Sequence, residues 1–416
     1  MMTLDTVFFT LKRQFCSAWR YGSENGFRSL LVMIWRKCRG SNGGGVAKRR
    51  VIDFYDFVRS DPIGVPLLPG SVLRTTLNWV LPPWNFGSGG HLNIFRFMHY
   101  LEKDGFDCRI IVVGAPPSLS VDEARKQIND WFFPLKGDIY LGIEKAPPAH
   151  VTIATSWPTA YSVRSFQSTV HRCYFVQDFE PAFYPAGAEY AWAEETYRFG
   201  FFGITAGTWL KDKLAAEYGM KTEAFGFSFD RDLYSPRKRR EPEIRRVFFY
   251  ARPPTPRRAF EMGLLVLEEV VRRLPDVKVI FAGWDISDCH IPFEHLNAGI
   301  VSLEKLPDLY SQCDAALVLS FTNLSLLPLE LMACGGVVVS NRAPCTEWLL
   351  NDQNARLAHQ TVEALADALC SVLEDSEEAS RLRQGGFATV AATDWKMEAR
   401  KVGDIFQRLD AQADAA

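Results

Sequence analysis

The sequence of 416 residues contains no apolar run near the roughly 20 residues that a membrane-spanning helix requires. The longest run near its start, Leu30 to Trp35, is flanked by Arg28 and Arg36. The early segment also lacks an apolar core followed by a small-residue cleavage site, so no signal peptide is predicted. These absences favour a cytoplasmic protein, with the inner face of the cell membrane as its one expected membrane contact.

Metal-binding and disulfide patterns are also missing. The nine cysteines include no Cys-x-x-Cys pair, many lie in apolar stretches, and the histidines are not clustered along the chain. This pattern predicts reduced core thiols and argues against both a disulfide framework and a structural zinc site. No aspartate-x-aspartate follows a predicted strand, so we expect neither a metal nor a cofactor requirement.

The net charge of −2 hides an uneven distribution. Residues 1–50 carry ten Lys/Arg against Asp5 and Glu24, and the rest of the chain is therefore strongly acidic on balance. An acidic main body argues against a nucleic-acid partner. We interpret the basic and aromatic segment 1–50 as an appendage to the main body. It either contacts an anionic membrane surface peripherally or forms a poorly ordered tail.

The length suits two domains, each with its own core. In the first, residues 51–235, a strand (Thr75 to Leu81), a glycine loop (Gly87 to Gly90), a helix (His91 to Lys103) and a second strand (Arg109 to Val113) follow one another. This order is that of a βαβ unit in a doubly wound sheet. Short apolar segments at Val151 to Thr155 and Tyr174 to Val176 are expected to extend the sheet.

A second alternating series occupies residues 247–390, after the charged stretch Ser235 to Arg246, which we interpret as a linker. Alternating strands and helices predict a parallel sheet covered on both faces. Residues 391–416 are expected to form a C-terminal helix that crosses back to the first domain. The predicted fold is therefore α/β, with two Rossmann-like doubly wound domains facing across a cleft. The expected strands of this half are Val247 to Tyr250, Val277 to Ala282, Ala315 to Leu319 and Val337 to Ser340, and the helices are Ala259 to Leu274, Leu306 to Cys313, Leu329 to Cys334 and Val362 to Glu374.

Basic residues follow the first strand of this second domain. Arg252 and Arg257 lie in a proline-stiffened loop, and guanidinium groups bind phosphate oxygens two at a time, which suits a diphosphate. A solvated basic loop is the alternative. Gly283, after the next predicted strand, allows close approach of a ligand, and Lys305 is either a further ligand-binding cation or a surface residue.

A carboxylate marks the helix that follows the predicted strand Ala315 to Leu319. Pro328 opens this helix, and Glu330 lies in its first turn. A carboxylate there can accept hydrogen bonds from two sugar hydroxyls, while the helix N-terminus favours phosphate. The alternative is that Glu330 only complements the helix dipole, worth about 0.3–1 kcal/mol.

In the first domain, backbone amides of Gly89 and Gly90 are candidates for phosphate contacts, and Asp178 and Glu180 for binding acceptor hydroxyls or taking the acceptor proton. The glycine loop lacks the Gly-x-Gly-x-x-Gly spacing, which counts against a nicotinamide-dependent dehydrogenase.

Taken in this order, these features resemble the donor domain of GT-B glycosyltransferases of family four, which carry an Arg and a Lys after the first strand and a later Glu-x7-Glu motif. Arg252 and Arg257 occupy the places of the diphosphate-binding pair. Glu330 occupies the place of the second, ribose-binding Glu. Thr322 replaces the first Glu, which leaves the usual contact to the donor sugar unassigned.

The sequence most resembles the WsaF-like rhamnosyltransferases of bacterial surface glycans, from about Leu77 to Leu357. The resemblance lies in segments Gly89 to Arg96, Tyr174 to Pro181 and Tyr250 to Pro253. It implies transfer of L-rhamnose from dTDP-L-rhamnose onto a glycan acceptor, with retention, and a donor-binding role for Lys305. Two alternatives stay open: a UDP- or GDP-sugar donor, and a non-catalytic nucleotide-sugar or glycan-binding protein.

Overall fold

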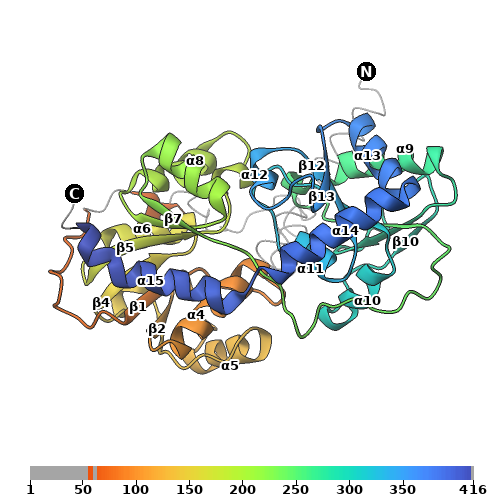
Figure 1. Cartoon of the computed structure of the whole chain (residues 1–416). Helices are drawn as coiled ribbons and strands as arrows, with labels where there is room; N and C mark the ends of the chain where they lie inside the picture. The colour runs from red at the N-terminus through yellow and green to blue at the C-terminus, as the bar shows by residue number, and fades with distance from the viewer. Residues whose placement is uncertain (1–54, 60–62, 414–416) are drawn as a thin grey trace, which may run out of the picture. The chain divides into compact units, whose positions relative to one another are not determined.

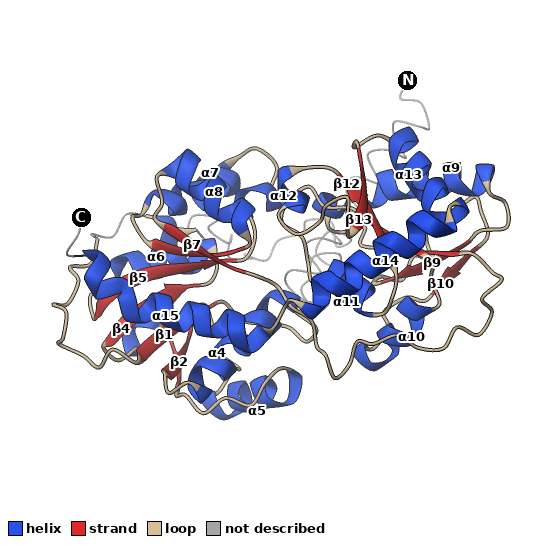
Figure 2. Cartoon of the chain, in the orientation of Figure 1, coloured by secondary structure: helices blue, strands red, loops and turns tan. Residues whose placement is uncertain are grey.

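A computed structural model describes residues 55–59 and 63–413. The predicted appendage, residues 1–50, lies outside this range. Residues 57–413 contain two entirely parallel sheets, each covered by helices, as the sequence predicted (Figures 1 and 2).

The first sheet has seven strands in the order β3-β2-β1-β4-β5-β6-β7. The chain starts in the middle, builds outward to one edge, and returns to extend the other side, so the strand order reverses between β1 and β4. Ligands bind at such reversal points, outside the carboxyl ends of the strands. The strands are β1 (Thr76–Leu81), β2 (Asp107–Val112), β3 (Ile139–Leu141), β4 (Ala149–Ala154), β5 (Thr169–Val176), β6 (Phe202–Ala206) and β7 (Thr222–Phe225).

Helices cover both faces of this sheet (Figure 2). Local signals set their ends: the Ser120 hydroxyl caps α5 by accepting from the Glu123 amide at 3.1 Å, and Gly219 ends α8 in the left-handed region. The helices are α4 (Gly89–Lys103), α5 (Val121–Trp131), α6 (Trp157–Ser165), α7 (Ala188–Glu195) and α8 (Thr208–Tyr218), with 3-10 turns η1 (Asp56–Val58), η2 (Ile143–Lys145), η3 (Glu180–Phe183) and η4 (Thr196–Arg198).

The second sheet has six strands in the order β10-β9-β8-β11-β12-β13, again reversing beside its first strand. Alternate residues of β8 face different cores: Val247 and Phe249 pack with α9 and α13, whereas Phe248 packs on the other face beside Tyr310 of α10. The strands are β8 (Arg246–Tyr250), β9 (Lys278–Ala282), β10 (His295–Asn297), β11 (Ala315–Val318), β12 (Val337–Asn341) and β13 (Ala355–Ala358).

Two helices of the second half begin at side-chain caps: the Thr361 hydroxyl accepts from the Ala364 amide at 3.2 Å, and the Asp375 carboxylate accepts from the Glu377 and Glu378 amides at 3.0 Å. The helices of this half are α9 (Phe260–Arg273), α10 (Leu306–Ser311), α11 (Leu327–Ala333), α12 (Pro344–Glu347), α13 (Val362–Glu374) and α14 (Ser376–Ala391), with 3-10 turns η5 (Pro256–Arg258) and η6 (Leu303–Lys305). Within residues 55–59 and 63–413, no helix is both long enough and apolar enough to span a bilayer.

The last helix, α15 (Trp395–Ala413), packs against α4 and β7 of the first sheet (Figure 1). Phe406 meets Trp79 of β1 edge-on, with ring centroids 6.3 Å apart, and the Glu398 carboxylate accepts from the Gly226 amide at 2.7 Å. Aromatic contacts of this kind add to the hydrophobic contribution of burial. The chain that leaves the second sheet thus ends on the first.

Several elements depart from the sequence-based expectations. Strand β5 begins at Thr169 rather than near Tyr174, and α4 begins at Gly89, so two glycines of the predicted loop are helical. Strands β3, β6, β7, β10 and β13 were not predicted. These are short segments without a long apolar run, and neighbouring strands stabilise them more than their own sequence does.

Candidate functional site

The site is built where the carboxyl ends of three strands come together. Strand β5 of the first sheet leads into Gln177 and Asp178, β8 of the second sheet into Arg252, and β11 into the loop that contains Thr322 and Asn323. Parallel strands place their carboxyl ends at one edge of a sheet, so polar residues after each strand gather there.

Asp178 joins the two halves of the molecule. One carboxylate oxygen, Oδ2, accepts from the Thr322 hydroxyl at 3.0 Å, and the other, Oδ1, accepts from the Asn323 amide at 2.8 Å. Oδ1 also accepts from the Phe179 amide at 2.8 Å, and Arg257 Nε lies 3.4 Å from Oδ2. Charge-assisted hydrogen bonds of this kind fix the carboxylate in one orientation.

Two arginines of the β8 loop have different environments. Arg257 lies with its guanidinium 4.0 Å from the centre of the Phe183 ring, and burial lowers its pKa although Asp178 opposes this shift. Arg258 donates to the Ser320 hydroxyl at 2.6 Å and to the Asn323 carbonyl at 3.1 Å. Arg258 therefore holds the β11 loop, whereas Arg257 is the arginine next to Asp178.

Asn323 was not predicted, yet it makes three hydrogen bonds to the first half. Its amide group donates to the carbonyls of Gln177 at 2.9 Å and Ala206 at 2.7 Å, and its side-chain oxygen accepts from the Trp348 indole at 2.8 Å. No local sequence signal identifies such a residue, because its partners lie on distant elements. Its position beside Thr322 was the only indication available.

Arg252 lies at the end of β8, half-buried, with its guanidinium 3.5 Å from the Tyr250 hydroxyl and 5.7 Å from the centre of the Trp284 ring. Gly283 has φ of 108°, and a Cβ there would lie 2.2 Å from the Tyr250 ring. Only glycine fits this position. The close approach at Gly283 is therefore to Tyr250, which itself lies next to Arg252.

Glu330 lies in the first turn of α11 and is half-buried. Burial raises the pKa of its carboxyl group to about 7, and hydrogen bonds from Tyr234 and Tyr310 and the charge of Arg96 partly oppose that shift. Arg96 comes from α4 of the first domain and is itself buried. The carboxyl group is thus close to its titration point at neutral pH.

Comparison with known proteins shows which families and folds this chain resembles. Residues 140–205 match the family described as "WsaF, N-terminal domain", and residues 245–370 match "WsaF, C-terminal domain". The chain is a WsaF-like protein with the GT-B glycosyltransferase fold. The C-terminal match contains Arg252, Arg257, Lys305, Thr322 and Glu330; the N-terminal match contains Asp178 and Glu180.

The O-antigen biosynthesis protein RfbC of Myxococcus xanthus is 32% identical over 353 residues, covering 82% of this chain and 28% of RfbC. The WsaF-like chain thus spans less than a third of that relative. Among solved structures, a sucrose-phosphate synthase of Thermosynechococcus elongatus has a TM-score of 0.63 at 14% identity, over 81% of this chain and 99% of the other. Anabaena Alr3699/HepE in complex with UDP-glucose has a TM-score of 0.62 at 14% identity, over 80% and 100%. These likenesses show a shared fold.

Other predicted site residues of this WsaF-like chain lie in different settings. Glu180 is 8% exposed and turned into its own domain, where its oxygens accept from the Tyr174 hydroxyl at 2.6 Å and the Trp157 amide at 2.8 Å. Burial raises its pKa to about 7. These contacts favour a structural role for Glu180, and its predicted acceptor role stays a prediction. Lys305 is exposed at the end of η6.

The glycine segment at the start of α4 leaves space beside it. A Cβ on Gly89 would meet nothing within 4 Å in the described part of the chain, and the Gly90 carbonyl accepts from the Gln177 side-chain Nε2 at 3.1 Å. Beside them, His91 pairs with the Ser88 hydroxyl at 2.8 Å, and burial lowers its pKa to about 4. His91 is therefore a neutral imidazole at physiological pH.

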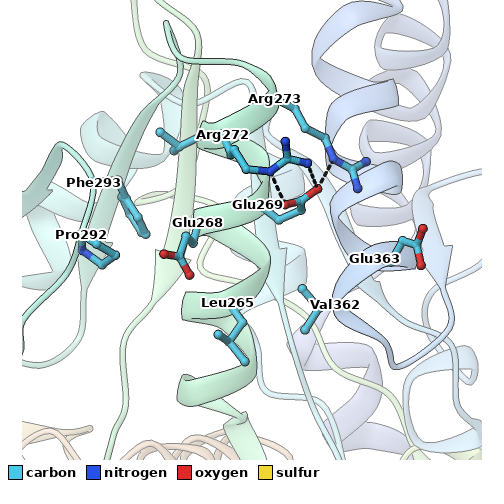
Figure 3. Close-up of a pocket in the computed structure, with 10 residues that line it drawn as sticks. Leu265, Glu268, Glu269, Arg272, Arg273, Pro292, Phe293, Val362 and Glu363 are labelled. Atoms are coloured by element: carbon cyan, nitrogen blue, oxygen red, sulfur yellow. Dashed lines mark hydrogen bonds and ion pairs between the residues drawn. The ribbon is translucent and has the colours of Figure 1, made fainter.

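Two hollows in this WsaF-like chain lie away from Arg252. The larger, about 730 Å³, is lined by α9 and α13 residues, with Glu269 ion-paired to Arg272 and Arg273 (Figure 3). It contains none of the predicted site residues. The second, about 550 Å³, lies between α8 and α12, where Trp209 and Trp348 line it. Through Trp348 it adjoins Asn323.

Proposed function

We propose that this chain transfers L-rhamnose from dTDP-L-rhamnose onto a glycan acceptor of a bacterial surface polysaccharide. The junction at Asp178 carries the proposal: a strand end of the first sheet meets Arg257, Thr322 and Asn323 at strand ends of the second. A two-substrate reaction needs such a meeting point, with one substrate held by each half. The WsaF domain matches and the RfbC relative support the choice of polysaccharide synthesis.

In the proposed reaction the bond from the sugar C1 to the diphosphate breaks while the acceptor hydroxyl oxygen bonds to C1 on the same face, with retention. The acceptor proton passes to the departing diphosphate oxygen. Negative charge grows on the diphosphate, so fixed cations there stabilise the transition state. We assign this role to Arg252, Arg257 and Lys305, with Glu330 as the acceptor for the 3′-hydroxyl of the deoxyribose.

We assign Asp178 to the reacting centre, where its contacts position Arg257. Three hydrogen-bond donors hold its carboxylate in one orientation, and the Arg257 guanidinium lies beside it as an ion-pair partner at the strand ends. We further propose that transfer needs no metal ion, so full activity is expected in chelator. Loss of activity in chelator that manganese restores would contradict this part.

Two features favour alternative donors or roles. Anabaena HepE was solved with UDP-glucose, and a variant of S. aureus TarM with UDP, which favours a UDP-sugar as second choice of donor. Thr322 replaces a motif carboxylate and donates a hydrogen bond to Asp178. Because the usual carboxylate contact to the donor sugar is missing, non-catalytic sugar binding is the second candidate function.

The test is a transfer assay with a rhamnose-terminated acceptor and dTDP-rhamnose, UDP-glucose or a GDP-sugar as donor. We expect transfer with dTDP-rhamnose, its loss in Arg252→Ala, and normal rates in Arg272→Ala, whose side chain is exposed on α9. Transfer only from a UDP- or GDP-sugar would overturn the donor assignment. Binding without transfer or hydrolysis of any donor would overturn the enzymatic proposal.

A further inference from the structure

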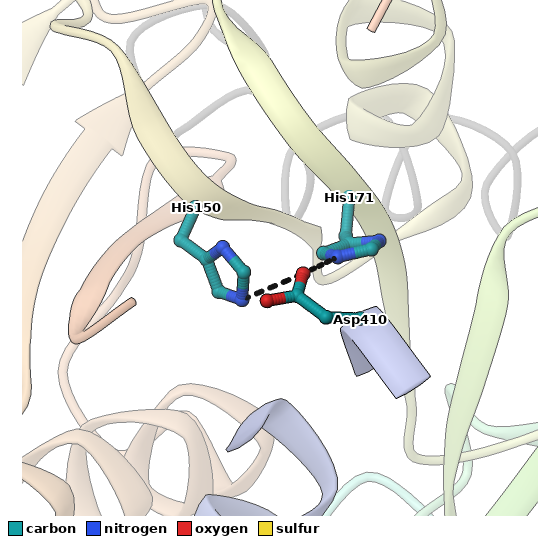
Figure 4. Close-up of side chains that lie close together, drawn as sticks. All are labelled: His150, His171 and Asp410. Carbon is teal, nitrogen blue, oxygen red and sulfur yellow. Dashed lines mark hydrogen bonds and ion pairs between the residues drawn. The ribbon is translucent and has the colours of Figure 1, made fainter. Parts of the chain in front are cut away.

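A group of potential metal ligands lies near the amino ends of β4 and β5, the opposite edge of the first sheet from Asp178. His150 comes from β4, His171 from β5, and Asp410 from the last turns of α15 (Figure 4). Asp410 Oδ1 lies 2.7 Å from His171 Nε2 and 3.8 Å from His150 Nε2. One ligand atom of each residue lies within 4.8 Å of the others.

His150 is the unusual member of the group. Its side chain is 0% exposed, yet neither ring nitrogen has a satisfactory hydrogen bond to any residue that the structure describes. Buried polar groups normally have partners, and an unpaired one is costly. The ring faces Asp410 and meets the His171 ring edge-on at 5.0 Å between centroids (Figure 4).

We propose that His150, His171 and Asp410 bind a divalent transition-metal ion, with zinc as the best fit. Two imidazole nitrogens and one carboxylate oxygen are ligands that zinc accepts, with water or another donor in the fourth position. A tetrahedral site with bonds of about 2.0–2.1 Å separates its ligand atoms by about 3.3 Å. The observed 2.7 and 3.8 Å lie on either side of that value and all three ligand atoms lie within 4.8 Å of one another, so side-chain movements must close the wider separations around a bound ion.

One neighbour bears on the affinity of this site. Arg74 pairs with Asp410 Oδ2 at 2.8 Å and competes as a cation, but its side chain is 63% exposed and free to turn away. Removing Arg74 should therefore strengthen metal binding.

The consequence is a tie between α15 and the first sheet. A bound ion would connect β4, β5 and the last helix, all remote from Arg252 and Glu330, so it would stabilise the fold without entering the transfer reaction. Cysteine and histidine spacing predicted no structural zinc site. That prediction considered ligands close in sequence, whereas His171 and Asp410 are 239 positions apart.

The test is calorimetric titration of Zn²⁺ into chelator-treated full-length protein, followed by thermal unfolding with and without Zn²⁺. We expect one bound ion per chain and an increase in Tm of several degrees. Mg²⁺ should produce neither effect. Arg74→Gln should bind Zn²⁺ several-fold more tightly than the wild type.

The variants His171→Asn and Asp410→Asn should lose at least tenfold in Zn²⁺ affinity, whereas His359→Ala, an exposed histidine outside the group, should match the wild type. Because α15 could loosen in these variants, circular dichroism must first show native helix content. Cobalt substitution gives an independent spectroscopic readout. Wild type that fails to bind Zn²⁺, folded variants that bind it normally, or a thiolate-to-cobalt charge-transfer band would each overturn the proposal.

Discussion

Strand β5 carries a polar cluster at each of its ends, and the two clusters differ in how complete they are. At the carboxyl end, the Asp178 carboxylate accepts hydrogen bonds from Phe179, Thr322 and Asn323, and Arg257 Nε lies 3.4 Å away as an ion-pair partner. At the amino end, His171 shares Asp410 with a buried histidine whose ring nitrogens lack good partners. Protein groups alone preorganise the first cluster, whereas in the second the ring nitrogens of His150 remain available to bind a metal ion.

The largest expected effect is on turnover, and it distinguishes Arg257, which lies beside Asp178, from arginines elsewhere. Arg257→Ala should lower turnover by about 10²–10³-fold, because it removes a fixed cation from the growing negative charge. Steady-state transfer rates measure this. Arg257→Lys should recover only part of the rate, because an ammonium group lacks the planar fork. A turnover loss no greater than that of Arg272→Ala would contradict the assignment.

A stability effect distinguishes the two carboxylates that follow β5. Glu180→Ala should cost about 2–4 kcal/mol of unfolding free energy, because it leaves the Trp157 amide and the Tyr174 hydroxyl buried without an acceptor. Urea unfolding measures this, with the exposed Glu217→Ala as control. Unchanged stability combined with lost acceptor affinity would instead support the predicted acceptor role of Glu180.

The titration of Glu330 gives a pH-dependent test. Its pKa is raised from 4.5 to about 7 in the folded protein, so its stabilising contribution is complete below pH 4.5 and is lost as pH rises through 7. Donor affinity should move in the opposite direction, because the ionised carboxylate accepts more strongly than the protonated group from the deoxyribose 3′-hydroxyl of dTDP. We expect dTDP to bind about tenfold more tightly at pH 8 than at pH 5.5, by calorimetry.

Glu180 also has a raised pKa, so the comparison must isolate Glu330. In Glu330→Gln, which cannot ionise, dTDP affinity should rise less with pH than in the wild type, because only the terminal phosphate of dTDP still titrates. The stability of this variant should also fall less than that of the wild type as pH rises. An equally steep affinity profile in Glu330→Gln would assign the titration to another group.

The smallest effect concerns the hydroxyl that joins the two halves. Thr322→Val should lower the free energy of unfolding by about 0.5–1.5 kcal/mol, because it removes one hydrogen bond to Asp178. Thr322→Ser should lower it by less. Thr322→Glu would place a second carboxylate beside Asp178 and should lower the free energy of unfolding more than either of these variants. A stable Thr322→Glu variant with altered sugar preference would show that the position selects the donor rather than supports Asp178.

The sequence was sufficient to predict the two parallel sheets and the helix Val362–Glu374, because apolar strands and an amphipathic helix are local patterns. It also predicted that residues after strands would gather, since parallel topology requires it. It could not assign partners across the chain. Thr322 bonds to a carboxylate 144 positions away, and Glu180 turns inward although Asp178, two residues earlier, faces the second sheet.

The amino-end cluster shows the same limit more strongly. His150, His171 and Asp410 share no motif, and only the return of α15 to the first sheet brings them together. That return was expected, but the side chains it would bring into contact were not. Strand register and side-chain direction determine which residues come into contact. Sequence periodicity does not predict either of them to within one residue.

The most direct test of the central claim, a donor site built by Arg252, Arg257 and Glu330, is calorimetric titration of dTDP into four proteins: wild type, Arg252→Ala, Glu330→Gln and the control Arg272→Ala. We expect equal affinity in wild type and Arg272→Ala, and at least tenfold weaker binding in the other two. Equal dTDP affinity in all four, with each protein folded, would place the nucleotide elsewhere and contradict the account.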